Sequence, residues 1–100
     1  MKAVWSNLVI AEADKDELVR IEGNWYFPPD SINKKYFTTT DTHSVCFWKG
    51  LASYYDLAAN GTTNKKGAWY YPKPTALSKK LVRKDFTNYV AFWPNVTVEE

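Results

Sequence analysis

The sequence has a single cysteine and lacks any long apolar run. Cys46 has no second thiol to pair with, so an internal disulfide is excluded. No segment approaches the roughly 18 consecutive apolar residues of a membrane-spanning helix, and residues 1–14 lack the apolar centre of a secretory signal peptide. We therefore expect a cytoplasmic protein without a membrane partner.

Motifs for metals and nucleotides are also missing. A zinc site takes about four ligands, commonly Cys and His, whereas this chain offers only His43 and Cys46. The four glycines are isolated from one another and match no phosphate-binding loop. Asp14, Asp16 and Glu17 lack the glycine and the spacing of a calcium loop. The sequence therefore predicts neither a metal nor a cofactor.

The charges nearly balance. Thirteen Lys and Arg against eleven Asp and Glu leave +2, which is too small to indicate a nucleic-acid or membrane partner. The distribution is uneven, because residues 1–60 carry six basic and eight acidic groups and residues 61–100 carry seven basic and three acidic groups. An ordinary solvated surface accounts for this difference, and the role of the basic segment 79–84 stays open.

Aromatic residues are plentiful. They make up 17% of the chain, within a hydrophobic share of 45%, against 24% charged residues. This composition supplies the apolar surface for a core. Because a chain of 100 residues cannot build two separate cores, the sequence predicts a single domain over residues 1–100.

Short apolar segments separated by turn residues predict a mainly β protein. Ser6-Asn7, Lys49-Gly50 and Asn60-Gly61 have the length of tight hairpin connections. Strands are predicted over residues 3–5, 8–11, 18–22, 43–48, 51–57, 68–71, 89–93 and 96–98, and short helices over residues 32–37 and 75–83. Seven or eight short strands at this spacing are typical of an antiparallel sandwich or barrel.

Cys46 and His43 are the first candidates for catalysis. A nucleophilic thiol needs a base beside it, and His43 lies three residues before Cys46 in the predicted strand 43–48. Odd spacing in a strand points two side chains to opposite faces. We therefore interpret Cys46 as a small packed side chain, and Asp56, a single acid on a strand, as solvated or bonded to backbone.

Aromatic residues occur in adjacent pairs and triplets. The clusters are Trp25-Tyr26-Phe27, Phe47-Trp48, Tyr54-Tyr55, Trp69-Tyr70-Tyr71 and Phe92-Trp93. Because consecutive strand residues point to opposite faces, each cluster gives one ring to the core and another to the second face. The second ring either packs in the core or lines a pocket or interface. Base stacking on residues 69–71 beside nearby lysines is a weaker alternative, since no nucleic-acid motif accompanies it.

Four ordered segments resemble the family known as domain of unknown function 427. They are residues 24–31 (NWYFPPDS), 44–55 (SVCFWKGLASYY), 68–72 (AWYYP) and 89–92 (YVAF). The resemblance implies a small single-domain β protein with two antiparallel sheets in a tent-like arrangement and no established activity. The chain departs from the family pattern at Trp25, where histidine is frequent, and at Phe47, where proline is usual. The family has also been labelled nucleotidyltransferase-like, but this chain has no phosphate loop and no metal-binding acid pair that would support that label.

These observations favour a binding module. The leading hypothesis is an aromatic cleft between two sheets that holds a small apolar or aromatic ligand, with Lys49 at its rim. The residues expected to line it are Tyr26, Trp48, Lys49, Tyr54, Trp69 and Tyr71. One alternative is a small enzyme that uses Cys46, Lys49, Tyr54 or Asp56. Another is a protein-interaction module, and the oligomeric state stays open.

Overall fold

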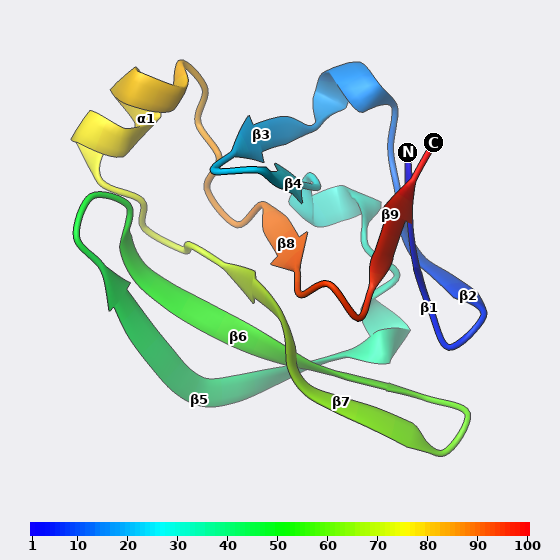
Figure 1. Cartoon of the computed structure of the whole chain (residues 1–100). Coiled ribbons are helices and arrows are strands. Elements are labelled where there is room, and N and C mark those ends of the chain that lie inside the picture. The colour runs from blue at the N-terminus through cyan, green and yellow to red at the C-terminus, as the bar shows by residue number, and fades with distance from the viewer.

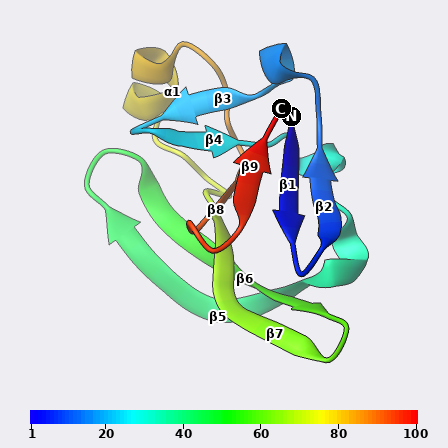
Figure 2. The same ribbon diagram turned by 45° about the vertical axis from the view of Figure 1, so that its right-hand side comes forward.

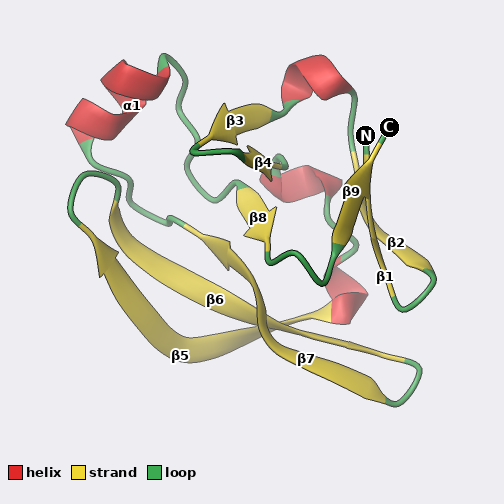
Figure 3. Cartoon of the chain, viewed as in Figure 1, coloured by secondary structure: helices red, strands yellow, loops and turns green.

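The computed structural model describes all 100 residues, which form nine strands and one α-helix (Figures 1 and 3). The strands are β1 (Lys2–Trp5), β2 (Leu8–Glu12), β3 (Val19–Ile21), β4 (Asn24–Tyr26), β5 (Phe37–Cys46), β6 (Gly50–Ala59), β7 (Thr62–Tyr70), β8 (Val90–Phe92) and β9 (Thr97–Glu99). The helix is α1 (Ala76–Val82), and 3-10 turns cover Lys15–Glu17, Pro29–Ser31 and Lys34–Tyr36. The predicted mainly β class is confirmed, with more strands than expected.

The strands form three antiparallel sheets rather than the two implied by the resemblance. Their orders are β2-β1-β9, β3-β4 and β5-β6-β7-β8. The hairpin β3-β4 joins the edge of the largest sheet, because the backbones of Phe27 and Val90 exchange two hydrogen bonds of 2.8 Å. β1 and β9 bring the two chain ends side by side (Figure 2).

Two apolar clusters lie on opposite faces of the largest sheet. Phe27, Val90 and Phe92 belong to the cluster shared with β1 and β2, whereas Tyr26 and Ala91 belong to the cluster shared with β3 and Phe86. Adjacent residues of one strand thus enter different clusters, as the alternation of strand side chains requires. The predicted division between two faces is confirmed for residues 25–27, 54–55 and 69–71, but not for Phe47-Trp48, which lies in the connection between β5 and β6 with Phe47 fully exposed.

Turns and the longer helix follow local chemistry. Asn60 and Gly61 have φ of 52° and 75°, and Ser6 and Asn7 have φ of 53° and 62°, so both predicted hairpins form. The Thr75 hydroxyl accepts a hydrogen bond of 3.1 Å from the backbone N–H of Ser78 and caps the start of α1.

The predicted helix over residues 32–37 is wrong. Ile32 forms an isolated bridge with Ala11 of β2, and the Asn33 N–H donates to the Ile10 carbonyl at 2.8 Å. This pairing holds the chain extended, so that only Lys34–Tyr36 turns as a 3-10 helix and Phe37 already begins β5. A contact with a distant strand therefore overrides the local helical spacing.

The connection between β5 and β6 also differs from the prediction. Residues 47–49 form it, and Gly50 is the first residue of β6. Gly50 has φ of +106°, and a Cβ there would lie 3.2 Å from the Lys73 carbonyl oxygen. Glycine is therefore needed both for its backbone angle and for the close approach of the segment before α1.

The single α-helix, α1, has seven residues, and the structure contains no helix that could cross a membrane.

Candidate ligand-binding site

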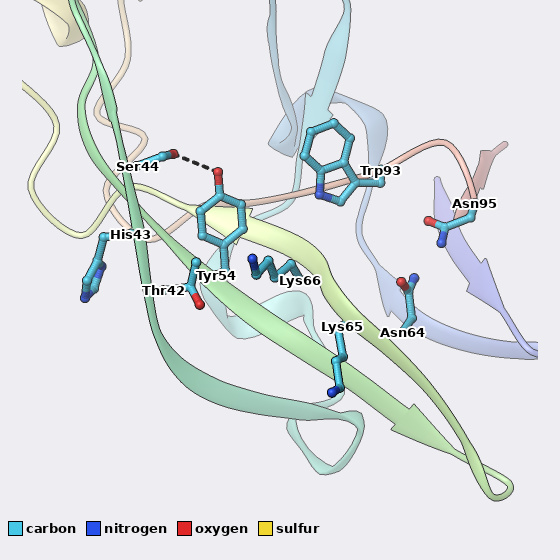
Figure 4. Close-up of a pocket in the computed structure, with 9 residues that line it drawn as sticks. All are labelled: Thr42, His43, Ser44, Tyr54, Asn64, Lys65, Lys66, Trp93 and Asn95. Carbon is cyan, nitrogen blue, oxygen red and sulfur yellow. Dashed lines mark hydrogen bonds between the residues drawn. The ribbon is translucent and has the colours of Figure 1, made fainter.

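A pocket of about 520 Å³ opens on the sheet formed by β5, β6 and β7 (Figure 4). β5 contributes Thr42, His43 and Ser44, β6 contributes Tyr54, β7 contributes Asn64, Lys65 and Lys66, and the segment after β8 contributes Trp93 and Asn95. His43 turns away from the other lining side chains (Figure 4) and its Nδ1 lies 3.0 Å from the Ser53 hydroxyl. The pocket is therefore built by polar side chains around two aromatic rings.

The pocket lies where the pairing of β6 is interrupted on both sides. Toward β5, Tyr54 alone stands opposite residues 40–42, and toward β7, Asp56 alone stands opposite residues 65–67. Such β-bulges bend a strand and redirect its side chains, and they occur frequently beside binding sites. Two bulges only two residues apart make a hollow in a face that regular pleating would leave flat.

The bulge toward β5 is held by side-chain hydrogen bonds. The Thr40 hydroxyl donates to the Tyr54 carbonyl at 2.9 Å, and the Thr42 N–H donates to the Thr40 hydroxyl at 3.2 Å. The Tyr54 phenol and the Ser44 hydroxyl lie 2.7 Å apart, as the dashed line in Figure 4 marks. These bonds fix the Tyr54 ring at the wall of the pocket.

The bulge toward β7 depends on Asp56 and Gly67. Lys66 has φ of +56°, and its N–H donates to Oδ1 of Asp56 at 2.8 Å. A Cβ on Gly67 would lie 2.6 Å from Nδ2 of Asn64, so glycine leaves room for the Asn64 amide. Consecutive residues of a regular strand face opposite sides, whereas the bulge lets both Lys65 and Lys66 line the same pocket.

The pocket is electropositive. Two lysines and no acidic residue are among its lining side chains, which favours a negatively charged ligand group. The Nδ2 atom of Asn64 is buried without a hydrogen-bond partner. An unpaired buried donor costs about 1–3 kcal/mol, so the edge of the pocket at Asn64 is not optimised for stability alone.

An aromatic stack connects the pocket with the core. The Trp93 ring lines the pocket and packs on Trp69 with a centroid distance of 4.9 Å. The Trp69 indole N–H donates to the Tyr26 phenol oxygen at 3.0 Å, and Tyr26 is fully buried. The wall behind Trp93 is therefore a rigid aromatic layer.

The comparison with known families gives one match, which extends over all 100 residues. The sequence matches the family NTP_transf_9, described as Domain of unknown function (DUF427), over residues 1–100. The chain belongs to the DUF427 family. No curated protein matches the sequence.

In this DUF427 chain, a buried lysine lies at the opposite end of the aromatic layer. The side chain of Lys49 pairs with Glu22, and its Nζ lies 5.3 Å and 5.2 Å from the ring centroids of Trp48 and Tyr71. Burial alone would lower the pKa of Lys49, but the hydrogen bond to Glu22 and the nearby phenols raise the pKa above its ordinary value. Lys49 is therefore an ammonium ion at neutral pH.

The structure distributes the six residues expected at the cleft over two places. Tyr54 lines the pocket, and Trp69 lies one ring behind it. Tyr26 and Tyr71 are buried in the cluster that contains Phe86, while Trp48 and Lys49 belong to the turn after β5. These rings form a continuous layer, but the pocket opens at only one end of it.

Sequence reasoning did not assign most of the lining residues to a site. Thr42, Asn64, Lys66 and Trp93 are brought together by the two bulges and by the return of the chain after β8. One signal was available, because an isolated glycine in a strand, such as Gly67, indicates a bulge or a close approach.

The catalytic candidates have other partners. Cys46 packs against the cluster that contains Tyr26, while His43 bonds to Ser53 on the opposite face of the sheet. Asp56 is occupied by the backbone N–H of Lys66. No group of three or more His, Cys, Asp or Glu side chains is placed to hold a metal ion.

Proposed function

We propose that this DUF427 domain binds a small molecule in the pocket on β5, β6 and β7. The observation that carries the proposal is the pair of bulges at Tyr54 and Asp56. Each bulge interrupts the regular pairing of β6 with a neighbouring strand. Together the two bulges place polar and aromatic side chains around one hollow. The proposal takes the largest sheet as one slope of the tent-like arrangement and the β3-β4 hairpin as the other.

The lining supports a flat ligand that carries a negative charge. Tyr54 and Trp93 provide ring surfaces and polar tips, and Lys65 and Lys66 provide cations at the β7 side. The ligand is therefore an aromatic anion, that is, a negatively charged form of the small apolar or aromatic ligand expected from the sequence.

The partners of the catalytic candidates support binding over catalysis. Lys49 is held by Glu22 and keeps its proton because its pKa is raised, so it is a poor nucleophile. The Tyr54 phenol is bonded to Ser44, and Asp56 caps a backbone N–H.

The test uses a matched pair of probes, 1-naphthoate and the neutral 1-naphthylmethanol, titrated into isotope-labelled protein and followed by amide chemical shifts. We expect 1-naphthoate to perturb residues 42–44 and 64–66, and Trp93→Ala to abolish this effect. Trp25→Ala, a half-buried tryptophan of β4 outside the lining, is the control. Perturbations that are scattered over the surface, or that survive Trp93→Ala, would contradict the proposal.

Charge is tested separately. The variant Lys65→Gln/Lys66→Gln is expected to weaken binding of 1-naphthoate at least about fivefold and to leave 1-naphthylmethanol unchanged. The control is Lys34→Gln/Lys35→Gln, a second pair of exposed consecutive lysines. Equal weakening of both probes would show that the lysines shape the pocket without selecting an anion. Native mass spectrometry of protein purified from its own host would then identify the bound mass.

A further inference from the structure

Exposed apolar side chains gather at the turn of the β5-β6 hairpin and on α1. Seven large apolar side chains are exposed, and five of them belong to the β5-β6 hairpin end or to α1. We call these five the hairpin-helix surface: Val45, Phe47, Leu51, Leu77 and Leu81. The other two, Val9 and Trp93, lie on β2 and in the pocket.

The two elements of the surface are joined through the start of α1. Thr75 donates its N–H to the Lys49 carbonyl at 3.1 Å, and its hydroxyl donates to the Trp48 carbonyl. Figures 1 and 2 both show α1 beside the loop between β5 and β6. The exposed residues of the hairpin and of the helix therefore belong to one end of the domain.

The exposure of this surface is not explained by packing. Phe47 is fully exposed in the turn, and Leu77 and Leu81 are 59% and 62% exposed. Positions 77 and 81 are one helical turn apart and share a face, whereas Ser78 is buried and Val82 packs on the core. Polar residues at positions 47, 77 and 81 would lose no packing contacts, so packing does not account for the apolar side chains there.

Basic residues outnumber acidic residues in the segments that carry the apolar side chains, although Lys84 is turned toward Glu17, whose carbonyl oxygen lies 3.4 Å from its Nζ. Residues 71–84 contain five basic residues and no acid, and residues 44–55 contain no acid. Lys49, the single basic residue of the second range, is already paired with Glu22. Asp85, the next acid along the chain, is bonded to Thr87. The net charge of +2 hides this asymmetry, because most acids lie in other parts of the chain.

We propose that the hairpin-helix surface docks on an anionic lipid bilayer. Phe47 and the two exposed leucines of α1 enter the headgroup region, and the lysines and arginine of segment 71–84 bind lipid phosphates and carboxylates. A bilayer fits better than a folded partner, because Phe47 projects from a turn and neither pocket of the structure includes any residue of this surface. A bilayer takes up projecting apolar side chains and attracts the nearby lysines at the same time, and this combination favours a bilayer over a folded partner.

The proposal is tested by co-sedimentation of the full chain with vesicles of phosphatidylcholine alone or mixed with phosphatidylserine. We expect binding to the mixed vesicles only, and loss of binding as salt is raised. Phe47→Ser and Lys79→Glu/Lys80→Glu should each weaken binding at least about tenfold. The controls are Val9→Ser, an exposed apolar residue elsewhere, and Lys34→Glu/Lys35→Glu, exposed lysines elsewhere.

Urea midpoints of all variants should match the parent chain, which separates loss of docking from loss of folding. Absence of binding to the mixed vesicles would overturn the proposal, as would equal binding to both vesicle types or equal effects of the control variants. Light scattering of the free protein gives a further outcome. A dimer that Phe47→Ser dissociates would assign the surface to a second copy of the chain and overturn the proposal as well.

Discussion

The ion pair joins a buried Lys49 to an exposed Glu22, so we expect unequal losses of stability when one or the other partner is removed. The Lys49 side chain is 7% exposed and the Glu22 side chain is 54% exposed. Removal of Glu22 leaves a cation buried among rings, whereas removal of Lys49 leaves a carboxylate that turns to water. Glu22→Gln should therefore destabilise the fold more than Lys49→Met.

The expected magnitudes follow from burial. Loss of one partner from a buried ion pair costs about 3–5 kcal/mol when the other charge stays buried. Because glutamine keeps one acceptor oxygen, we expect the lower end, about 3 kcal/mol, for Glu22→Gln. Methionine replaces most of the apolar stem of Lys49, so Lys49→Met should cost about 1 kcal/mol or less.

Urea unfolding at neutral pH, followed by tryptophan fluorescence, measures both free energies. The double variant Glu22→Gln/Lys49→Met is the control, because it contains neither charge and should resemble Lys49→Met. A larger loss for Lys49→Met than for Glu22→Gln would refute this reasoning and show that the ammonium contributes mainly through its contacts with the rings of Trp48 and Tyr71.

Three further predictions concern the bulge and the buried phenols. Gly67→Ala should cost about 1–3 kcal/mol in urea unfolding and weaken 1-naphthoate binding, because its Cβ would lie 2.6 Å from the Asn64 amide and 2.8 Å from Cδ1 of Leu57; unchanged binding would contradict the prediction. Burial, followed by the neighbouring phenol of Tyr26, raises the pKa of Tyr71 from 10.0 to about 12. The folded state then keeps a proton that the unfolded chain releases, so stability is full below about pH 10 and falls as pH rises toward 12; Tyr71→Phe should flatten this slope, and an unchanged slope would exclude the assignment. Asp56→Ala should cost about 1 kcal/mol and speed amide hydrogen exchange at Lys66, and an unchanged exchange rate would show that the backbone alone holds the bulge.

Local chemistry made part of the fold predictable. Asn60-Gly61 tolerates positive φ wherever it occurs, and Thr75 caps a helix through its own hydroxyl, so both features could be recognised without tertiary information. The helix predicted after Ile32 failed because β2 recruits that residue into an extended bridge. The sequence did not indicate the first halves of β5 and β7, because residues 38–42 and 62–66 are polar and show no apolar alternation. Both strands are therefore longer than predicted.

The site was less predictable because it depends on pairing between strands. Tyr54 was expected at the cleft as part of an aromatic cluster, but nothing local shows that three residues of β5 stand opposite it. Trp93 belonged to a recognised cluster, yet its position over the pocket is set by the packing of β8 against β7. Gly67 was visible as an isolated glycine, and only the structure shows Asn64 in the space it leaves.

The bulge at residues 40–42 also affects how this chain behaves toward copies of itself. β5 is the outer strand of the largest sheet and has ten residues, a length at which a regular strand would offer a template for pairing with another chain. The bulge divides the strand into two regular pieces, residues 37–39 and 43–46. Both pieces are shorter than the roughly six or seven residues typical of fibril-forming segments, so we expect the irregularity that hollows the face also to limit pairing of β5 with other copies of the chain.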